Sequence, residues 1–278
     1  MSDVLALPGG IPGLSHVPAW FNDPENWWGE FGLLERIKEH LALSGVILVA
    51  AILIAFPLGV YIGHTGHGSA AVGGLANALR AVPTLGFVIL LYVILSTKVV
   101  SSLSVPALFA RGGLPAFLAA LIGLVILAIP PILTNTYAGI QAVDPDVRDA
   151  AAGMGMTGGQ IIRQVEIPCA LPLIFSGLRS ATLQVIASVT VAAYVPLVGG
   201  LGQLIAQGAQ SLTDPQFGYP AMVSAGITVA VLAILIDLVL AGLQRLLVSP
   251  GISGRLSPRT SRSRRTTRRP VEGQLADA

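Results

Sequence analysis

Five long apolar runs limit the folds that this chain can adopt. They cover residues 41 to 62, 75 to 96, 114 to 138, 170 to 197 and 219 to 247. At ~1.5 Å per residue, a helix of any of these lengths can cross a hydrocarbon core of ~30 Å. Backbone polar groups inside a bilayer must be paired within the protein, so long apolar segments become helices there. The sequence therefore predicts an all-α integral membrane protein with about five transmembrane helices.

Composition excludes an ordinary soluble domain. Hydrophobic residues make up 53% of the chain and charged residues 11%, and the mean hydropathy is +0.76. These values lie far from those of globular domains. A phosphate-binding Gly-x4-Gly-Lys-Ser/Thr loop is missing, because neither Lys38 nor Lys98 follows that glycine pattern. If ATP drives this protein, a separate subunit must hydrolyse it.

No catalytic, cofactor or metal site can be assigned from the sequence. Cys169 is the one cysteine, so neither an intrachain disulfide nor a cysteine-based zinc site can form. His64 and His67 follow the first apolar run, but no acid or third ligand stands beside them, which favours a solvated turn over a metal site. No Ser-His-Asp or paired-carboxylate arrangement is recognisable. We therefore expect a protein that is not itself an enzyme.

Arginines near the end of the chain predict its orientation. Eight of the 16 Lys and Arg residues lie at or after Arg245, and the positive-inside rule places that end on the cytoplasmic side of the membrane. With five crossings, the N-terminus lies outside and the loop between the third and fourth runs is cytoplasmic. Residues 249 to 278 are expected to be a disordered basic tail that lies on anionic lipid rather than on nucleic acid.

The cytoplasmic loop, residues 139 to 168, begins with a predicted short helix. Asp144 suits the N-cap position and Pro145 the first helical position. Asp146 and Asp149 lie in or near the first turn, where the positive end of the helix dipole favours acids. We therefore expect a helix that starts at Pro145.

A glycine turn and a second short helix should follow. Gly153 and Gly155 relax the backbone, and Thr157 with Gln160 makes a capping-box pair for a helix that should end before Pro168. Small side chains and adaptable methionines would then let a partner approach closely. The residues concerned are Ala150, Ala151, Ala152, Met154 and Met156.

The spacing within this loop resembles the cytoplasmic coupling loop of binding-protein-dependent ABC importers. Asp149-Ala150-Ala151 is followed by Gly155 and then by Val165-Glu166-Ile167-Pro168, an aliphatic-x-aliphatic-Pro ending. The family usually carries Glu where this chain has Asp149. The resemblance implies that an ATPase docks on Asp149, Ala150, Ala151, Gly153, Met154, Gly155, Met156, Thr157 and Pro168.

Other segments are similar to the osmoprotectant branch of these permeases, which serves glycine betaine, carnitine and choline uptake. They are residues 131 to 137, 143 to 145, 151 to 157 and 199 to 202. The resemblance implies the type I ABC importer permease fold over residues 40 to 248, in a multi-pass protein of the bacterial cell membrane. It also implies partners: cytoplasmic ABC ATPase subunits, a second permease of the same or a related sequence, and an extracytoplasmic solute-binding protein that selects the solute.

Polar residues within the apolar runs are candidates for the translocation path or its gates. Arg179 and Asp237 are charges in the fourth and fifth runs, and they either pair with each other or extend toward the interface. Asn135 and Tyr137 follow a Pro-Pro pair. Interhelical hydrogen bonding explains these two residues as well as contact with solute does.

Three further candidates lie toward the outer end of the fourth run. Gly199 and Gly200 fit either close packing at an external gate or an ordinary tight loop. Tyr194, like Tyr137, could give an aromatic wall to a path for a compact quaternary ammonium solute.

Residues 1 to 39 form an expected extracytoplasmic segment. They hold all three tryptophans, Trp20, Trp27 and Trp28, beside Phe21 and Phe31. These aromatic residues fit an interfacial belt, or a cage for a cationic ligand. Residues 29 to 40 predict an amphipathic helix.

Other functions compete with the importer interpretation. An ion-coupled secondary transporter or channel would show an inverted repeat and acids at mid-membrane, and neither is clear in this sequence. A membrane-embedded enzyme would need a catalytic set. Within the importer class, the solute could instead be another small molecule, such as an amino acid.

Overall fold

The computed structural model describes residues 14–68, 72–74, 78–79, 81–98, 113–194 and 198–248, and every regular element in these ranges is a helix. The basic tail at 249–278 lies outside the described residues, as do residues 1–13 and parts of the 75–96 and 170–197 runs. The prediction of an all-α protein is confirmed.

Four helices in this part of the chain are long and apolar enough to cross a membrane. They are α2 (Leu33–Thr65), α5 (Gly113–Gln141), α8 (Ile167–Ala192) and α10 (Gly218–Leu247). The apolar helix α4 (Thr84–Lys98) is shorter, at 15 residues, and falls on the second predicted span. The short elements are η1 (Leu14–His16), α1 (Val17–Asn22), η2 (Pro24–Asn26), α6 (Pro145–Gly153), α7 (Gly158–Ile161), η3 (Ile162–Glu166) and α9 (Leu201–Gln210).

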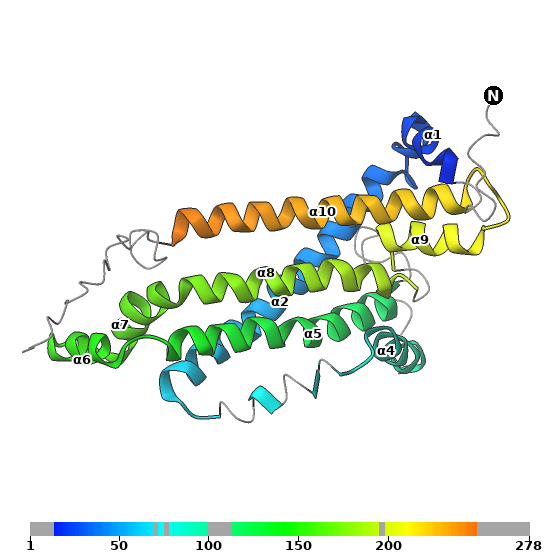
Figure 1. Cartoon of the computed structure of the whole chain (residues 1–278). Helices are drawn as coiled ribbons and strands as arrows, with labels where there is room; N and C mark the ends of the chain where they lie inside the picture. Colours follow the sequence, from blue (N-terminus) through cyan, green and yellow to red (C-terminus); the bar gives the residue numbers. More distant parts are fainter. Residues whose placement is uncertain are drawn as a thin grey trace, which may run out of the picture.

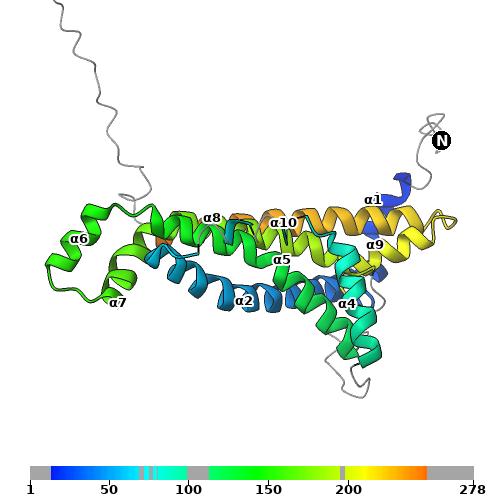
Figure 2. The same cartoon turned by 90° about the horizontal axis from the view of Figure 1, so that it is seen from below.

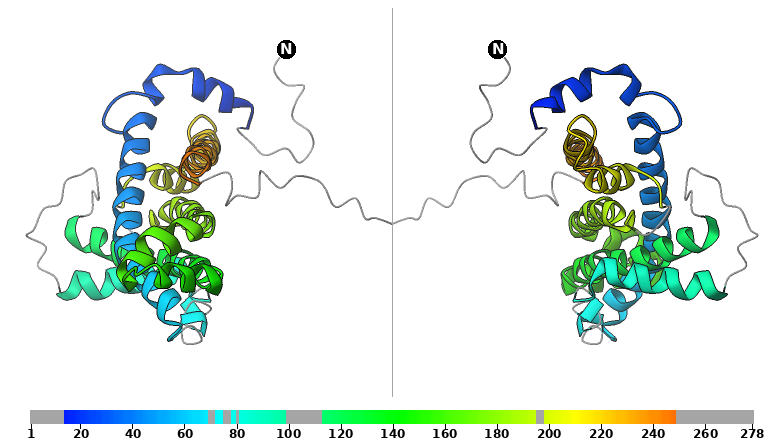
Figure 3. Two further views of the ribbon diagram at one scale, coloured as in Figure 1. Left: turned by 90° about the vertical axis from the view of Figure 1, so that its left-hand side faces the viewer. Right: turned by 90° about the vertical axis from the view of Figure 1, so that its right-hand side faces the viewer.

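The long helices form a layer with one helix across it. α5, α8 and α10 lie side by side, and α2 crosses one face of this layer, packed on α5 and α8 (Figures 1 and 3). α4 flanks α5 at an angle to the bundle (Figure 2). α6 and α7 project from one end of the bundle, here called the hairpin end, whereas α1 and α9 lie at the opposite, far end (Figure 1).

α2 and α5 run in the same direction. A Cβ on Gly63, near the end of α2, would lie 2.6 Å from the side chain of Ile140 in the last turn of α5. Both helices therefore finish at the hairpin end. Among the described residues, four long helices and the shorter apolar helix α4 therefore correspond to the prediction of about five spans.

Small residues let these helices approach closely. A Cβ on Gly177 of α8 would lie 2.6 Å from the carbonyl oxygen of Pro131 in α5, so a larger residue would push the two helices apart. Without a hydrophobic force between helices in lipid, such close contact is a main source of association. Fully buried alanines extend the same contacts: Ala51, Ala55, Ala116, Ala119, Ala120, Ala128 and Ala181.

The aromatic N-terminal segment packs on α9 and α10. Trp20 is buried, its ring meets Phe21 edge-on with centroids 5.6 Å apart, and Trp27 Nε1 donates to the carbonyl of Phe21 at 2.7 Å. Trp28 alone of the three tryptophans is largely exposed, at 71%. The rings of Trp20, Phe21 and Trp27 therefore pack in a local core at the far end. Its other members are Leu33, Leu201, Leu204, Ala221 and Ala225.

The first spanning helix begins before the first apolar run. α2 starts at Leu33 and continues without a break to Thr65. The amphipathic helix expected at 29–40 is thus the first part of α2, and the expected domain boundary at residue 39 falls inside a continuous helix. Its charged first turns bring polar side chains to the far end of the bundle.

Candidate functional site

The loop after α5 folds into the helical hairpin that its sequence predicts. α6 begins at Pro145, and Asp144 Oδ1 accepts a hydrogen bond from the backbone N–H of Asp146 at 2.9 Å. This cap satisfies one of the N–H groups that lack an intrahelical partner at a helix start. Asp149 and Ala150 are exposed on α6, whereas Ala151 is buried against the rest of the hairpin.

The turn of the hairpin presents an apolar tip. Gly155 has φ +83°, a left-handed conformation that glycine adopts without strain. Beside it, Met154 is 76% exposed, and no atom lies within 4 Å of the position that a Cβ on Gly155 would take. Gln160 Oε1 accepts from the backbone N–H of Thr157 at 2.7 Å, so the predicted capping box starts α7. The tip is therefore well formed and open to a partner.

The second hairpin helix does not end before Pro168, as the sequence had predicted. α7 leads into a π-helical turn, η3, and then directly into α8, which gives one helical stretch from Gly158 to Ala192. Pro168 lies in the first turn of α8, directly after the π turn, and it does not end the helical stretch. The wider π turn ahead of it marks a change of helical geometry between hairpin and span, of the kind often found at functional sites.

The side chains of His64, Arg148 and Glu166 meet at the root of the hairpin. Glu166, at the end of η3, is completely buried. Its carboxylate oxygens lie 2.9 Å from His64 Nδ1, at the end of α2, and 3.2 Å from Arg148 Nε in α6. Arg148 Nη2 also donates to the carbonyl of Ile140 in the last turn of α5. This root cluster, His64, Arg148 and Glu166, therefore joins the hairpin to α2, α5 and α8.

Sequence reasoning did not find the root cluster. His64 was interpreted as part of a solvated turn, and Glu166 as the variable position before Ile167 and Pro168. A signal existed, because Glu166 is an acid between aliphatic residues at the start of an apolar run, and a buried carboxylate requires a partner. The sequence could not say which basic residue would supply it.

The glycines predicted for an outer gate pack against the start of α2. Gly200 has φ +88°, and its N–H donates to Glu39 Oε2 at 2.7 Å. A Cβ on Gly199 would lie 2.6 Å from the same oxygen, so close packing rather than an open loop explains both glycines. Arg36 adds bonds to Gln203 and Gln207 on α9 at 3.2 and 3.0 Å. The far end is thus held together by buried polar contacts between α2 and α9.

The remaining path candidates lie at separate places. Asn135 donates its amide to the carbonyl of Pro131 at 2.8 Å, a bond within α5 rather than between helices. Tyr137 is half-buried beside the main core, and Tyr194 is 50% exposed at the far end. The structure therefore does not gather the predicted path residues into one site within this chain.

Arg179 and Asp237 form a two-point ion pair between α8 and α10. Arg179 Nε and Nη2 donate to the two carboxylate oxygens at 2.8 and 2.7 Å. Of the two alternatives left open by the sequence, pairing is the one observed. The side chains remain 34% and 26% exposed at ~15–18 Å from the hairpin ends of their helices, so the pair faces the surface of this chain near mid-span.

This pair leads to a prediction on stability. Arg179→Ala or Asp237→Ala alone should lower the melting temperature of the purified protein, because each leaves a lone charge between two spans. The double variant should recover part of that loss, since no uncompensated charge remains. Thermal unfolding of the wild type, the two single variants and the double variant in the same detergent measures the coupling between the two side chains. A loss of melting temperature in the double variant equal to the sum of the two single losses would contradict the prediction.

Among the described residues, no group of three or more His, Cys, Asp or Glu side chains is placed to hold a metal ion. The features that could support function are thus the hairpin with its root cluster, the Arg179–Asp237 pair, and the polar contacts at the far end.

Residues 42–249 match the model of a protein family described as the binding-protein-dependent transport system inner membrane component. A glycine betaine/carnitine/choline transport system permease protein of Bacillus subtilis is 34% identical over 222 residues, 80% of this chain and 91% of that protein. A choline transport system permease protein of the same bacterium is 31% identical over 220 residues, 79% and 90%.

Solved structures resemble the fold. A chain of the methionine ABC transporter in an inward-facing conformation gives a TM-score of 0.62 at 20% identity, covering 78% of this chain and 96% of its own. An amino acid ABC transporter solved with histidines gives 0.53 at 20% identity, covering 77% and 91%. At such identities the likeness bears on the fold alone, and it agrees with the predicted type I permease fold.

Proposed function

Because this chain belongs to the family of binding-protein-dependent transport system inner membrane components, we propose that it is a permease subunit of an ATP-driven importer of osmoprotectants. The proposed solutes are small quaternary ammonium compounds such as glycine betaine, choline or carnitine. The observation that carries the proposal is the hairpin at the end of the bundle, with an open tip and a charged root that reaches three spans.

The hairpin is the proposed docking point for a separate ATPase subunit. Its exposed Met154 and small residues would enter a groove on the ATPase, and the turn at Gly155 sets the shape of the tip. Movement of the ATPase would then reach α8 through η3, and α2 and α5 through the root cluster. In this proposal the subunit itself catalyses nothing, and its partner hydrolyses ATP.

The hairpin end would face the cytoplasm. The described chain begins and ends at opposite ends of the bundle, which fits an outer N-terminus and an inner C-terminus (Figure 1). The arginine-rich end of the sequence supports this direction through the positive-inside rule. The far end, with α1 and α9, would then receive the solute-binding protein.

A second permease copy or relative would complete the path. The exposed Arg179–Asp237 pair supports this, because charges at this depth are costly against hydrocarbon and usually face a protein interior or water. We therefore assign the α8–α10 face that carries the pair to the path or to the contact with the second permease.

The names of the relatives support the solute class. The two permeases of Bacillus subtilis described above serve glycine betaine, carnitine and choline transport or choline transport. The solved structures described above belong to amino acid transporters, but at 20% identity their likeness bears on the fold alone. A quaternary ammonium solute is thus the better assignment.

The test is uptake of labelled glycine betaine, choline and carnitine at high osmolarity, in strains with and without this gene and its partner genes. We expect a loss of uptake of at least one of the three when the gene is deleted. Labelled methionine and histidine serve as controls and should enter both strains equally. A deficit confined to an amino acid would remove the osmoprotectant assignment and leave the importer assignment in place.

A further inference from the structure

A cavity of about 450 Å³ opens at the far end, between the aromatic N-terminal segment, the start of α2, and α9. This volume is within the ~300–1,000 Å³ of typical small-molecule sites. The nearby turns of α2 carry charged residues, so the cavity lies outside the apolar part of the span. Nothing assigned so far to the hairpin or to the ion pair uses it.

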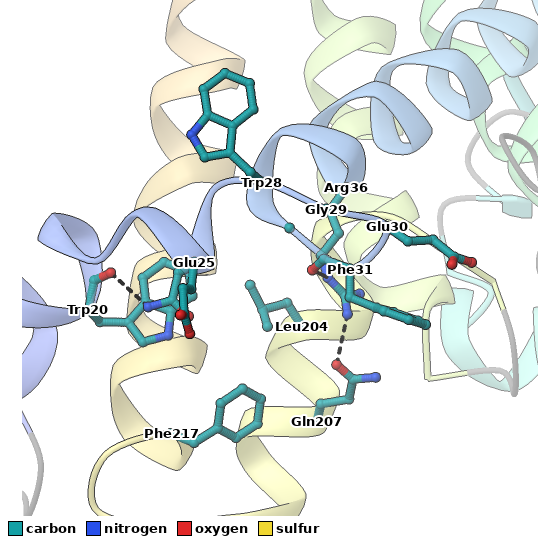
Figure 4. A pocket seen from close by; sticks show the side chains of 12 residues that line it. Trp20, Glu25, Trp28, Gly29, Glu30, Phe31, Arg36, Leu204, Gln207 and Phe217 are labelled. Carbon is teal, nitrogen blue, oxygen red and sulfur yellow. Dashed lines mark hydrogen bonds between the residues drawn. The ribbon is translucent and has the colours of Figure 1, made fainter.

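Aromatic rings and an apolar residue form much of its lining. Figure 4 shows Trp20 and Glu25 on one side of Leu204, Phe31 on the other side, and Phe217 below. The ring of Trp28 projects away from these side chains (Figure 4). Aromatic faces carry partial negative charge and attract cations that are weakly hydrated.

The charges of the lining also favour a cation. The carboxylate of Glu25 has no hydrogen-bond or ion-pair partner in the described part of the chain. The cation in the lining, Arg36, is already bound: it donates to the carbonyl of Phe31 at 3.0 Å and to Gln207 at 3.0 Å. Arg36 therefore fixes the wall that carries Phe31, whereas Glu25 offers an unused negative charge.

One buried polar atom in the lining also lacks a partner. Trp20 is 6% exposed, and its Nε1 makes no hydrogen bond within the described residues. A buried indole N–H normally finds an acceptor. This N–H is closed off from solvent, so an oxygen of a bound solute would reach it only after the Trp20 ring turns.

We propose that this cavity is a receiving site for the ammonium end of the solute, between Trp20, Phe31 and Phe217 and next to Glu25. The proposal rests on the proposed function, because it assigns the site to solute entering at the far end. A weak site suits this place, since solute has to leave it for the path. The same chemistry would accept the ammonium of a lipid headgroup.

The test uses intrinsic fluorescence of the purified full-length chain. All three tryptophans lie between residues 20 and 28, so the signal reports on this region alone. In nanodiscs of phosphatidylglycerol, which has no ammonium group, choline and tetramethylammonium should change the fluorescence saturably. The neutral isostere 3,3-dimethylbutanol should not. Phe31→Ala and Glu25→Gln, which keep every tryptophan, should each weaken binding about two- to fivefold.

Matched controls separate the cavity from general effects. Glu35→Gln removes an acid from the same end of α2 that does not line the cavity, and Tyr61→Ala removes an exposed aromatic ring near the hairpin end. Both should titrate like the wild type. A second set of nanodiscs, made with phosphatidylethanolamine, tests whether the ammonium of a lipid headgroup binds in the cavity. Competing headgroups would shift the choline titration curve to higher choline concentration.

The proposal is overturned if the isostere acts as choline does, if the titrations show no saturation, or if Phe31→Ala and Glu25→Gln bind like the controls. Uptake in cells is measured separately. Binding without uptake would remove the proposed function and keep the site, whereas uptake without binding would remove the site alone.

Discussion

Replacing Arg148 with Ala should abolish most solute uptake while the protein stays in the membrane. Glu166 is completely buried, and without Arg148 only His64 remains in contact with its carboxylate. Breaking a buried ion pair in this way costs about 3–5 kcal/mol. The same substitution also removes the bond from Arg148 to the carbonyl of Ile140, so the hairpin loses its polar contact with α5. Uptake in cells, the amount of membrane protein, and ATPase activity of the reconstituted complex measure the effect.

A double variant and a matched control make this prediction specific. Arg148→Ala with Glu166→Ala removes both charges and should melt at a higher temperature than Arg148→Ala alone. Arg163→Ala removes an exposed arginine from η3 in the same hairpin and should behave like the wild type. If Arg163→Ala is as damaging as Arg148→Ala, positive charge on the hairpin matters and the root cluster does not.

Gly155→Leu should uncouple ATP hydrolysis from transport. Leu strains the backbone at φ +83° by about 1–2 kcal/mol, and it adds bulk at the tip proposed to enter the ATPase groove. No neighbour lies within 4 Å of the new Cβ, so the bundle itself should fold normally. We expect solute uptake to fall about tenfold, which corresponds to ~1.4 kcal/mol of lost docking energy.

Other substitutions at the tip separate strain from bulk. Gly155→Asn should retain more uptake than Gly155→Leu, because Asn tolerates the left-handed conformation and is smaller. Gly159→Ala, in α7 with open space around its Cβ, should leave uptake unchanged. Wild-type uptake by Gly155→Leu would contradict the proposed role of the tip.

The hairpin illustrates what local sequence rules can predict. Asp144 caps α6, Pro145 starts it, and Thr157 with Gln160 starts α7, all as expected. Each of these features depends on residues within a few positions of one another. The prediction that the second helix ends before Pro168 was wrong. It relied on the rule that the residue before a proline avoids helical conformation, whereas here a π turn precedes Pro168 and the helix continues through it.

The path candidates illustrate the opposite case. The sequence identified Arg179 and Asp237 as unusual charges but left open whether they meet, and they do, across 58 residues. It selected Gly199 and Gly200 without their partner Glu39, which is 161 residues from Gly200. Composition also grouped Trp20 with the exposed Trp28, although packing on α9 and α10 buries the first and leaves the second outside.

The sequence by itself determined that this protein is an all-α membrane protein with a capped helical hairpin, because apolar length, capping and turn conformation are local properties. The tertiary structure alone decided that Glu166 joins His64, 102 residues away, and Arg148 into the root of that hairpin. It also decided which glycines bring helices together and where the far-end cavity opens. These features depend on which helix faces come into contact. In the sequence, a charge within an apolar run or a small residue indicates that a partner is required, but it does not identify the partner.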